Sequence, residues 1–199
     1  MISHEYKFIF VHIPKCGGTS IERVFVNKDI TQGKHQTLSQ FPSKYSTAYY
    51  KFSFVRNPWD MTTSLYRFLW ESLYSWPVQW RKAHPKFSQL SFREWVTHPF
   101  FKSSPSIRSL DVVSPRGQDG SFRDWLSSDS CKIDFIGRFE NLQEDFDKIC
   151  CDIDIAPVKL PHINKTDGPH YTTYYDDETR EIVRQKYQED IKFFNYKFG

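Results

Sequence analysis

The sequence predicts a three-layer α/β domain with a central parallel sheet, because short apolar runs rich in β-formers alternate with amphipathic helical patterns along the 199 residues. Units of a strand followed by a helix are joined by crossovers, which place successive strands parallel to one another. Hydrophobic residues make up 39% of the chain and aromatic residues 18%, enough to build a core and to exclude disorder for most of it. The length favours a single domain over residues 1–199.

The first unit begins with a strand over residues 6–13, an apolar run that Pro14 ends. A turn containing Gly17 and Gly18 follows. After it, residues 21–25 place their apolar side chains on one helical face. The chain therefore opens with a strand, a glycine loop and a helix.

The second unit has a short strand over residues 52–55, and Asn57 and Pro58 are suited to the N-cap and first position of the next helix. That helix is amphipathic. Its apolar residues are Met61, Leu65, Phe68, Leu69 and Leu73. A third unit pairs a strand over residues 133–136 with a helix over 140–150.

The stretch from residue 74 to 130 interrupts this alternation, since it is rich in Trp, Ser, Pro and Arg and contains only short helical patches. We interpret it as a mainly helical insertion that shapes the substrate side. Its tryptophans either line a sugar-binding cleft or pack in the core. The residues concerned are Trp70, Trp76, Trp80, Trp95 and Trp125. A long loop over 156–175 and a final helix near 176–194 complete the chain.

Charge and cysteine content restrict the class of protein. The chain has 27 Lys and Arg against 24 Asp and Glu, a balance that argues against a duplex-DNA binder. No apolar run has the ~20 residues needed to span a bilayer, so we expect no membrane span. The four cysteines form no CxxC pair and have no metal-ligand spacing, which favours a reducing cytoplasm and no metal site.

The glycine loop has the features of an anion-binding site. Backbone N–H groups between a strand and a helix point toward one spot, where the helix N-terminus adds partial positive charge. Lys15 stands at the entrance, and the hydroxyls of Thr19 and Ser20 can donate to the same oxygens. We predict a phosphate or sulfate ligand and a P-loop-like domain. The alternative is a glycine turn that only joins strand and helix.

Two common phosphate sites fit the loop poorly. A Walker A loop places its lysine after the last glycine, whereas Lys15 precedes both glycines, so an ordinary ATP or GTP site is disfavoured. A cysteine phosphatase needs a shorter, fixed distance between its cysteine and arginine than the one from Cys16 to Arg23.

These residues resemble sulfotransferases that use 3′-phosphoadenosine 5′-phosphosulfate (PAPS), in particular the branch that includes carbohydrate sulfotransferases. Residues 10–20, FVHIPKCGGTS, are similar to the family's 5′-phosphosulfate loop. Residues 54–60, FVRNPWD, together with Ser64 are similar to its 3′-phosphate site, where an arginine at a strand end and a serine eight residues later hold the phosphate. Further similar segments lie at 137–142, 160–166 and 190–196.

The resemblance implies PAPS as cofactor, 3′,5′-bisphosphoadenosine as product and a set of binding residues. The loop set is Lys15, Cys16 through its backbone N–H, Gly17, Gly18, Thr19 and Ser20. Arg56 and Ser64 would hold the 3′-phosphate, unless Arg56 instead pairs with Asp60. A late polar loop would close over the nucleotide or remain exposed. Its residues are Asn164, Lys165 and Thr166.

Sulfuryl transfer needs a base for the acceptor hydroxyl and positive charge near the leaving phosphate. We assign the charge to Lys15, which removes the need for a metal. His35 is the favoured base, because the chain after the first helix should return over the loop and its His-x-Thr segment resembles the catalytic histidine region of some glycan sulfotransferases. Glu22 is the second candidate. The alternatives are a surface histidine and a solvated helix-face carboxylate, and His12 receives no role.

The sequence therefore predicts a PAPS-dependent sulfotransferase acting on a hydroxyl acceptor, with a carbohydrate as the expected substrate. Two other readings stay open. A nucleotide kinase-like phosphoryl transferase would share the fold but lacks its GK[ST] motif here. A non-catalytic module that holds the bisphosphate nucleotide or a glycan would retain the binding residues without the base.

Overall fold

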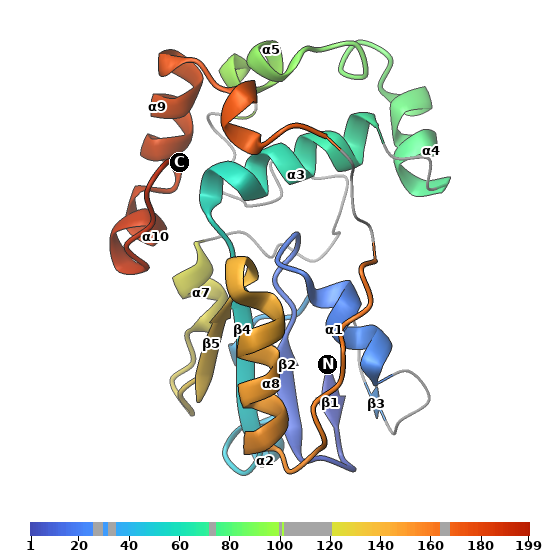
Figure 1. Cartoon of the computed structure of the whole chain (residues 1–199), viewed down its shortest axis with the longest axis vertical. Coiled ribbons are helices and arrows are strands. Elements are labelled where there is room, and N and C mark those ends of the chain that lie inside the picture. The colour runs from blue at the N-terminus through green and yellow to red at the C-terminus, as the bar shows by residue number, and fades with distance from the viewer. Residues whose placement is uncertain (26–29, 32–34, 72–74, 100, 102–120, 164–167) are drawn as a thin grey trace. The chain divides into compact units, whose positions relative to one another are not determined.

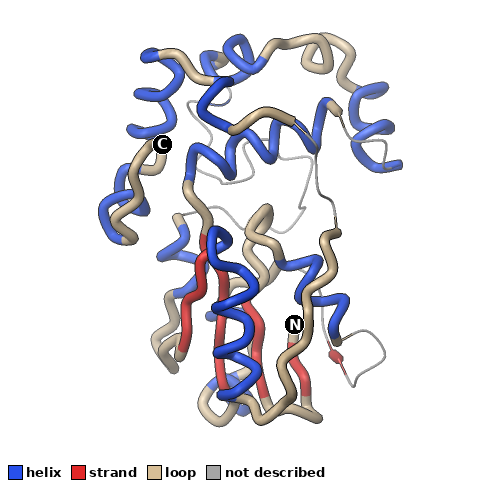
Figure 2. Tube along the Cα trace, in the orientation of Figure 1, coloured by secondary structure: helices blue, strands red, loops and turns tan. Residues whose placement is uncertain are grey.

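The computed structural model describes residues 1–199 except 26–29, 32–34, 72–74, 100, 102–120 and 164–167. They form two compact units (Figure 1). The first comprises Met1–Arg56 and Gly120–Asn164, and the second comprises Asn57–Asp119 and Lys165–Gly199. The strands in Figure 2 all belong to the first unit, and the described part of the second consists of helices and loops. The predicted insertion is divided between the two units. The single-domain, three-layer, P-loop-like organisation stays a prediction.

The sheet of the first unit has the strand order β3-β1-β2-β4-β5. The parallel prediction is confirmed for β2 (Phe8–Val11), β4 (Tyr50–Val55) and β5 (Phe135–Arg138). It is wrong at the edge formed by β1 (Ile2–Ser3) and β3 (Ile30–Thr31), whose pairings are antiparallel. The short turn between β1 and β2 leaves no room for a crossover helix, so these neighbours must run in opposite directions. The molecule is therefore α/β with a mixed sheet.

Aromatic side chains make the core of the first unit. The Phe52 ring lies 5.3 Å from that of Phe8 and 5.0 Å from that of Phe10, between ring centroids. Phe25, just after helix α1 (Gly18–Val24), contacts Phe8 and also Phe146 of α8 (Leu142–Asp152). Helix α8 packs against β5 (Figure 1). The high aromatic content is thus used to join the sheet to its helices.

The third predicted strand is displaced by two residues, from 133–136 to 135–138. Asp134 explains the shift, because its carboxylate accepts the backbone N–H of Lys51 at 2.7 Å and also pairs with the Lys51 ammonium. The Asp134 backbone N–H still donates to the Lys51 carbonyl at 2.8 Å, but the Lys51 N–H is bonded to a side chain, and regular pairing with β4 begins at Phe135 opposite Phe52. Smaller elements of this unit are η1 (Leu38–Gln40), α2 (Ser43–Ser46), α7 (Phe122–Leu126) and η2 (Phe139–Asn141).

Helix α3 (Pro58–Trp70) organises the second unit and begins as predicted. The Asn57 side chain accepts the backbone N–H of Trp59 at 3.1 Å, and Pro58 occupies the first turn. The buried Arg67 donates to the Tyr174 hydroxyl at 3.1 Å and to the Pro169 carbonyl, which ties η3 (Tyr171–Tyr174) to α3. These two acceptors satisfy part of a buried cation's hydrogen-bonding capacity.

Three of the five tryptophans are buried and so favour packing in the core rather than lining a sugar-binding cleft, and the side chain of Trp76 lies outside the described residues. Trp80 of α4 (Ser75–Ala83) and Trp95 of α5 (Phe92–Thr97) are 3% and 1% exposed. Both contact Trp70, with ring centroids 5.6 and 5.5 Å apart. In the first unit, Trp125 is fully buried.

The final helix is divided into α9 (Asp177–Lys186) and α10 (Gln188–Phe193), so the prediction of one helix is wrong there. Tyr187 leaves the helical conformation, with φ −111° and ψ 24°, and its ring is buried.

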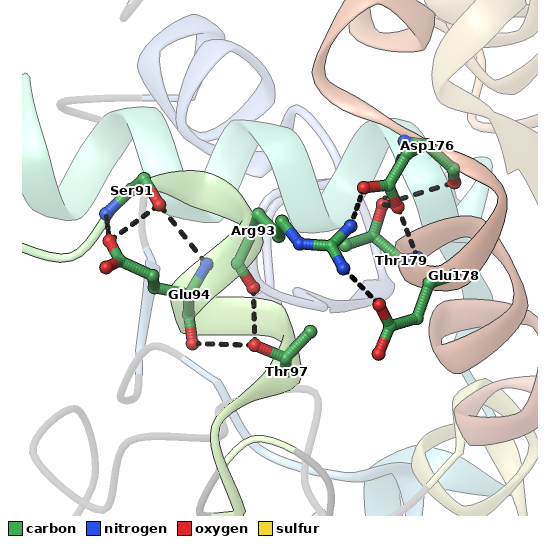
Figure 3. Close-up of polar contacts among 7 residues, drawn as sticks. All are labelled: Ser91, Arg93, Glu94, Thr97, Asp176, Glu178 and Thr179. Carbon is green, nitrogen blue, oxygen red and sulfur yellow. Dashed lines mark hydrogen bonds and ion pairs between the residues drawn. The ribbon is translucent and has the colours of Figure 1, made fainter.

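Figure 3 shows how α9 is joined to α5. Arg93 pairs with Asp176 and Glu178 at the start of α9, where Asp176 also caps the helix by accepting the backbone N–H of Thr179.

Gly137 generates a stability prediction. A Cβ at this position would lie 2.4 Å from a ring carbon of the buried Phe54, so Gly137→Ala must displace that ring. We expect a loss of about 1–3 kcal/mol in the free energy of unfolding. Urea denaturation would measure it. Ile136→Val, at the neighbouring half-buried position, is the control and should cost at most about 1 kcal/mol. Equal stability of Gly137→Ala and the wild type would contradict the packing described.

Candidate active site

The carboxyl ends of β2, β4 and β5 meet at one edge of the sheet, because the three strands are parallel neighbours. The glycine loop follows β2, Arg56 follows β4, and Phe139 follows β5. In open α/β sheets this edge is where ligands bind. Three segments that are distant in the sequence are therefore brought together.

Packing requires both glycines of the loop. Gly17 has φ +81°, and a Cβ there would lie 2.9 Å from the Leu142 side chain. A Cβ on Gly18 would lie 2.1 Å from the His12 ring. Gly17 is also the N-cap of α1, and its position provides no side-chain cap for the helix. The amides at the start of α1 thus lack a capping side chain, as expected of a helix end that receives an anion.

Lys15 has an unusual backbone conformation and a lowered pKa. Its backbone is left-handed, with φ +65°, and its side chain is partly buried. Burial, and to a lesser degree the charge of Arg56, lower the pKa of Lys15 to about 7, while Cys16 partly opposes both effects. Near neutral pH this ammonium is therefore poised between its charged and neutral forms.

Arg56 has two contacts within the first unit. One guanidinium nitrogen donates to the Lys15 carbonyl at 2.9 Å. The guanidinium also stacks over the Phe139 ring, 3.7 Å from its centroid. These contacts place its charge beside the loop.

The other predicted loop residues differ in exposure. Cys16 is fully buried and Ser20 is 6% exposed, whereas Thr19 is half-buried. The Cys16 side chain is thus shielded from solvent, and the predicted use of its backbone N–H stays a prediction. Of the two hydroxyl residues, Thr19 is the more exposed.

The buried His12 and the half-buried Glu22 form a pair that the sequence did not predict. The distance from His12 Nδ1 to Glu22 Oε1 is 2.7 Å, and the side chains are 5% and 15% exposed. The interpretation of Glu22 as a solvated helix-face carboxylate is therefore wrong. The four-residue spacing of Gly18 and Glu22 could have predicted a partner for Glu22. It places both residues on one helix face, where glycine leaves space for a neighbouring ring.

His35 lies beside His12, as the expected return of the chain over the loop requires. Its Nδ1 is 3.2 Å from the His12 carbonyl oxygen, and the two ring centroids are 4.4 Å apart. A carbonyl only accepts, so Nδ1 of His35 carries the proton and Nε2 is the basic nitrogen. This is the tautomer that a general base needs.

The remaining predicted residues lie elsewhere. Ser64 is half-buried in α3, within the second unit. Asn164, Lys165 and Thr166 fall outside the described residues. Within the part of the chain that the structure describes, His, Cys, Asp and Glu form no group of three suited to a metal. No helix among those residues has the length and apolarity to cross a membrane.

A family model described as "Sulfotransferase family" matches residues 1–197. The chain belongs to the sulfotransferase family. The match covers residues of both structural units and supports a transferase that moves sulfuryl groups. Searches of curated proteins and of solved structures gave no match.

The lowered pKa of Lys15 predicts a pH dependence of stability in this sulfotransferase. The native lysine loses its proton near pH 7 and the unfolded one near 10.5, so between these values the unfolded state binds more protons. Stability should therefore rise with pH in this window. Relative to Lys15→Met, we expect a gain of about 1–2 kcal/mol between pH 7 and 9, measured by urea unfolding. A difference that is independent of pH would contradict the assignment.

Proposed function

We propose that the protein transfers the sulfuryl group of PAPS to a hydroxyl acceptor, with a carbohydrate as the substrate class. The observation that carries the proposal is the convergence of two cations, Lys15 and Arg56, beside the N-terminus of α1. Family membership supports sulfuryl transfer. The PAPS donor and the glycan acceptor rest on the motif resemblance at residues 10–20 and 54–64, and a cytoplasmic location stays a prediction.

The loop suits an anionic group of high charge density. Arg56 disfavours the charged form of Lys15, and a bound phosphate would offset that repulsion. Because α1 receives no side-chain cap from Gly17, its first amides can donate to the same oxygens. The residues present therefore fit a 5′-phosphosulfate. Arg56 and Ser64 are the proposed 3′-phosphate residues, with Asn164, Lys165 and Thr166 as the proposed closing loop.

When bound, PAPS would supply the sulfuryl group and a phosphate leaving group. His35 accepts the proton of the acceptor hydroxyl at Nε2 while the acceptor oxygen forms its bond to sulfur. Lys15 would place positive charge beside the leaving phosphate. The loop amides from Cys16 to Thr19 and the Ser20 hydroxyl would hold the same phosphate, because the Ser20 amide already donates to the Gly17 carbonyl at 3.0 Å. The sulfated acceptor and the 3′,5′-bisphosphate are the products, and the proton remains on His35 until it passes to solvent.

Nucleotide binding tests the donor directly. A ligand that binds only the native state raises stability by RT ln(1 + [L]/Kd), or about 2.7 kcal/mol at 100 times Kd. We expect 3′,5′-bisphosphoadenosine to raise the melting temperature more than ADP, and Arg56→Ala to abolish the difference. Arg184→Ala, in the exposed part of α9, is the matched control. Stabilisation by ATP with magnesium alone would replace this proposal with a kinase-like phosphoryl transferase.

Turnover tests the two catalytic assignments. Lys15→Ala should lower kcat by about 10²–10³-fold, because a preorganised donor to the leaving group is worth about 3–4 kcal/mol. His35→Ala should lower it by about 10²-fold or more. Transfer of ³⁵S from labelled PAPS to a panel of glycans would measure both. Binding of the bisphosphate without turnover on any acceptor would indicate a non-catalytic module, and normal turnover of Lys15→Ala would exclude its proposed role.

A further inference from the structure

The His12–Glu22 pair has no part in the mechanism above, although it lies beside the residues that do. Its members are 5% and 15% exposed, and the Nδ1–Oε1 distance is 2.7 Å. A carboxylate buried to this degree is costly unless good hydrogen bonds compensate it. A pair of this kind next to the glycine loop can serve packing alone or can act on a neighbouring group.

Gly18 makes the pair possible. It lies one turn before Glu22 on α1, so the two positions share a helix face. A Cβ at position 18 would lie 2.2 Å from His12 Nε2, which means that the imidazole occupies the space of the missing side chain. The ring also stacks on Phe10, at 5.5 Å between centroids and 15° between planes. His12 is therefore clamped between β2 and α1, and the Glu22 carboxylate holds the proton on its Nδ1.

Two contacts join His12 to His35, so that the fixed position of His12 also restrains His35. Its carbonyl accepts from His35 Nδ1 at 3.2 Å, and its ring lies against the His35 ring, 4.4 Å between centroids. The backbone of His35 is left-handed, with φ +64°, a conformation that a non-glycine residue adopts only when its surroundings hold it there. The orientation of His35 is thus set by the residue that Glu22 holds.

We propose that Glu22 and His12 are positioning residues for His35. They fix the Nδ1–H tautomer of its ring and direct Nε2 toward the acceptor hydroxyl, and the Glu22 carboxylate stabilises the imidazolium that forms when His35 takes the proton. The inference rests on the proposed function, in which His35 is the base. It follows the general pattern in which a base is oriented by a third group.

Other charged groups lie near this chain of contacts. Lys15 and Arg56 are on the loop side, where Arg56 donates to the Lys15 carbonyl and the pKa of Lys15 is lowered to about 7. The Met1 amino group interacts with Glu22, but burial lowers its pKa to about 5 and Glu22 only partly offsets this, so it is neutral above pH 6. Signals specific to the His35 ring are needed to separate its titration from that of Lys15.

Kinetics of Glu22→Gln give the first test. We expect kcat to fall about tenfold, KM for PAPS to change less than twofold, and the acid limb of the pH–rate profile to move down by about 0.5–1 pH unit. Glu144→Gln removes an exposed carboxylate from α8 and should change none of these. In a His35→Ala background, Glu22→Gln should have no further effect. A wild-type profile for Glu22→Gln, or an equal loss in both backgrounds, would overturn the proposal.

Titration of ¹⁵N-labelled imidazoles by NMR tests the positioning without turnover. Wild-type His35 should show the Nδ1–H tautomer, and Glu22→Gln should lower its titration midpoint by about 0.5–1 unit. An unchanged midpoint and tautomer would overturn the proposal even in an active enzyme. If bisphosphate binding and sulfuryl transfer were both absent while the midpoint moved, the proposed function would fail and the positioning would stand. Glu22→Asp, which keeps the charge, provides the measurement should Glu22→Gln not fold.

Discussion

Parallel hydrogen bonding among β2, β4 and β5 brings the ends of the three strands to one edge of the sheet, with Val11 opposite Ser53 and Val55 opposite Arg138. The segments that leave this edge carry the loop lysine, Arg56 and Phe139. A reversal of any one strand would send its following segment to the opposite edge. The candidate site therefore depends on strand direction before it depends on any single side chain.

Close packing then determines how the loop is used. The spaces beside Gly17 and Gly18 are filled by Leu142 and by His12, so the two glycines serve the fit of α1 against its neighbours. That fit leaves the amides of the loop at the sheet edge and draws His12 onto the helix face that carries Glu22. One steric requirement thus produces both the helix end for which we propose an anion and the pair of His12 with Glu22.

The side chains on the two sides of the loop carry opposite charges. On one side, burial and Arg56 hold Lys15 at a pKa of about 7, which favours a ligand that brings negative charge. On the other, the Glu22 carboxylate lies 2.7 Å from His12 Nδ1. Sulfuryl transfer needs this combination, because negative charge develops on the leaving phosphate while the base acquires a proton. The family match is consistent with such an arrangement.

The sequence by itself determined the strand–loop–helix units, the cap at Asn57 and the family motifs, because these depend on local periodicity and on residues adjacent in the chain. It located the loop and the return of His35 toward it. The antiparallel edge, the shift of β5 caused by Asp134, the break at Tyr187 and the partnership of His12 with Glu22 were decided by tertiary structure. Each depends on a side chain or strand meeting a partner that is distant in sequence or that lies across a packed face, and such contacts leave no periodic signal in the chain.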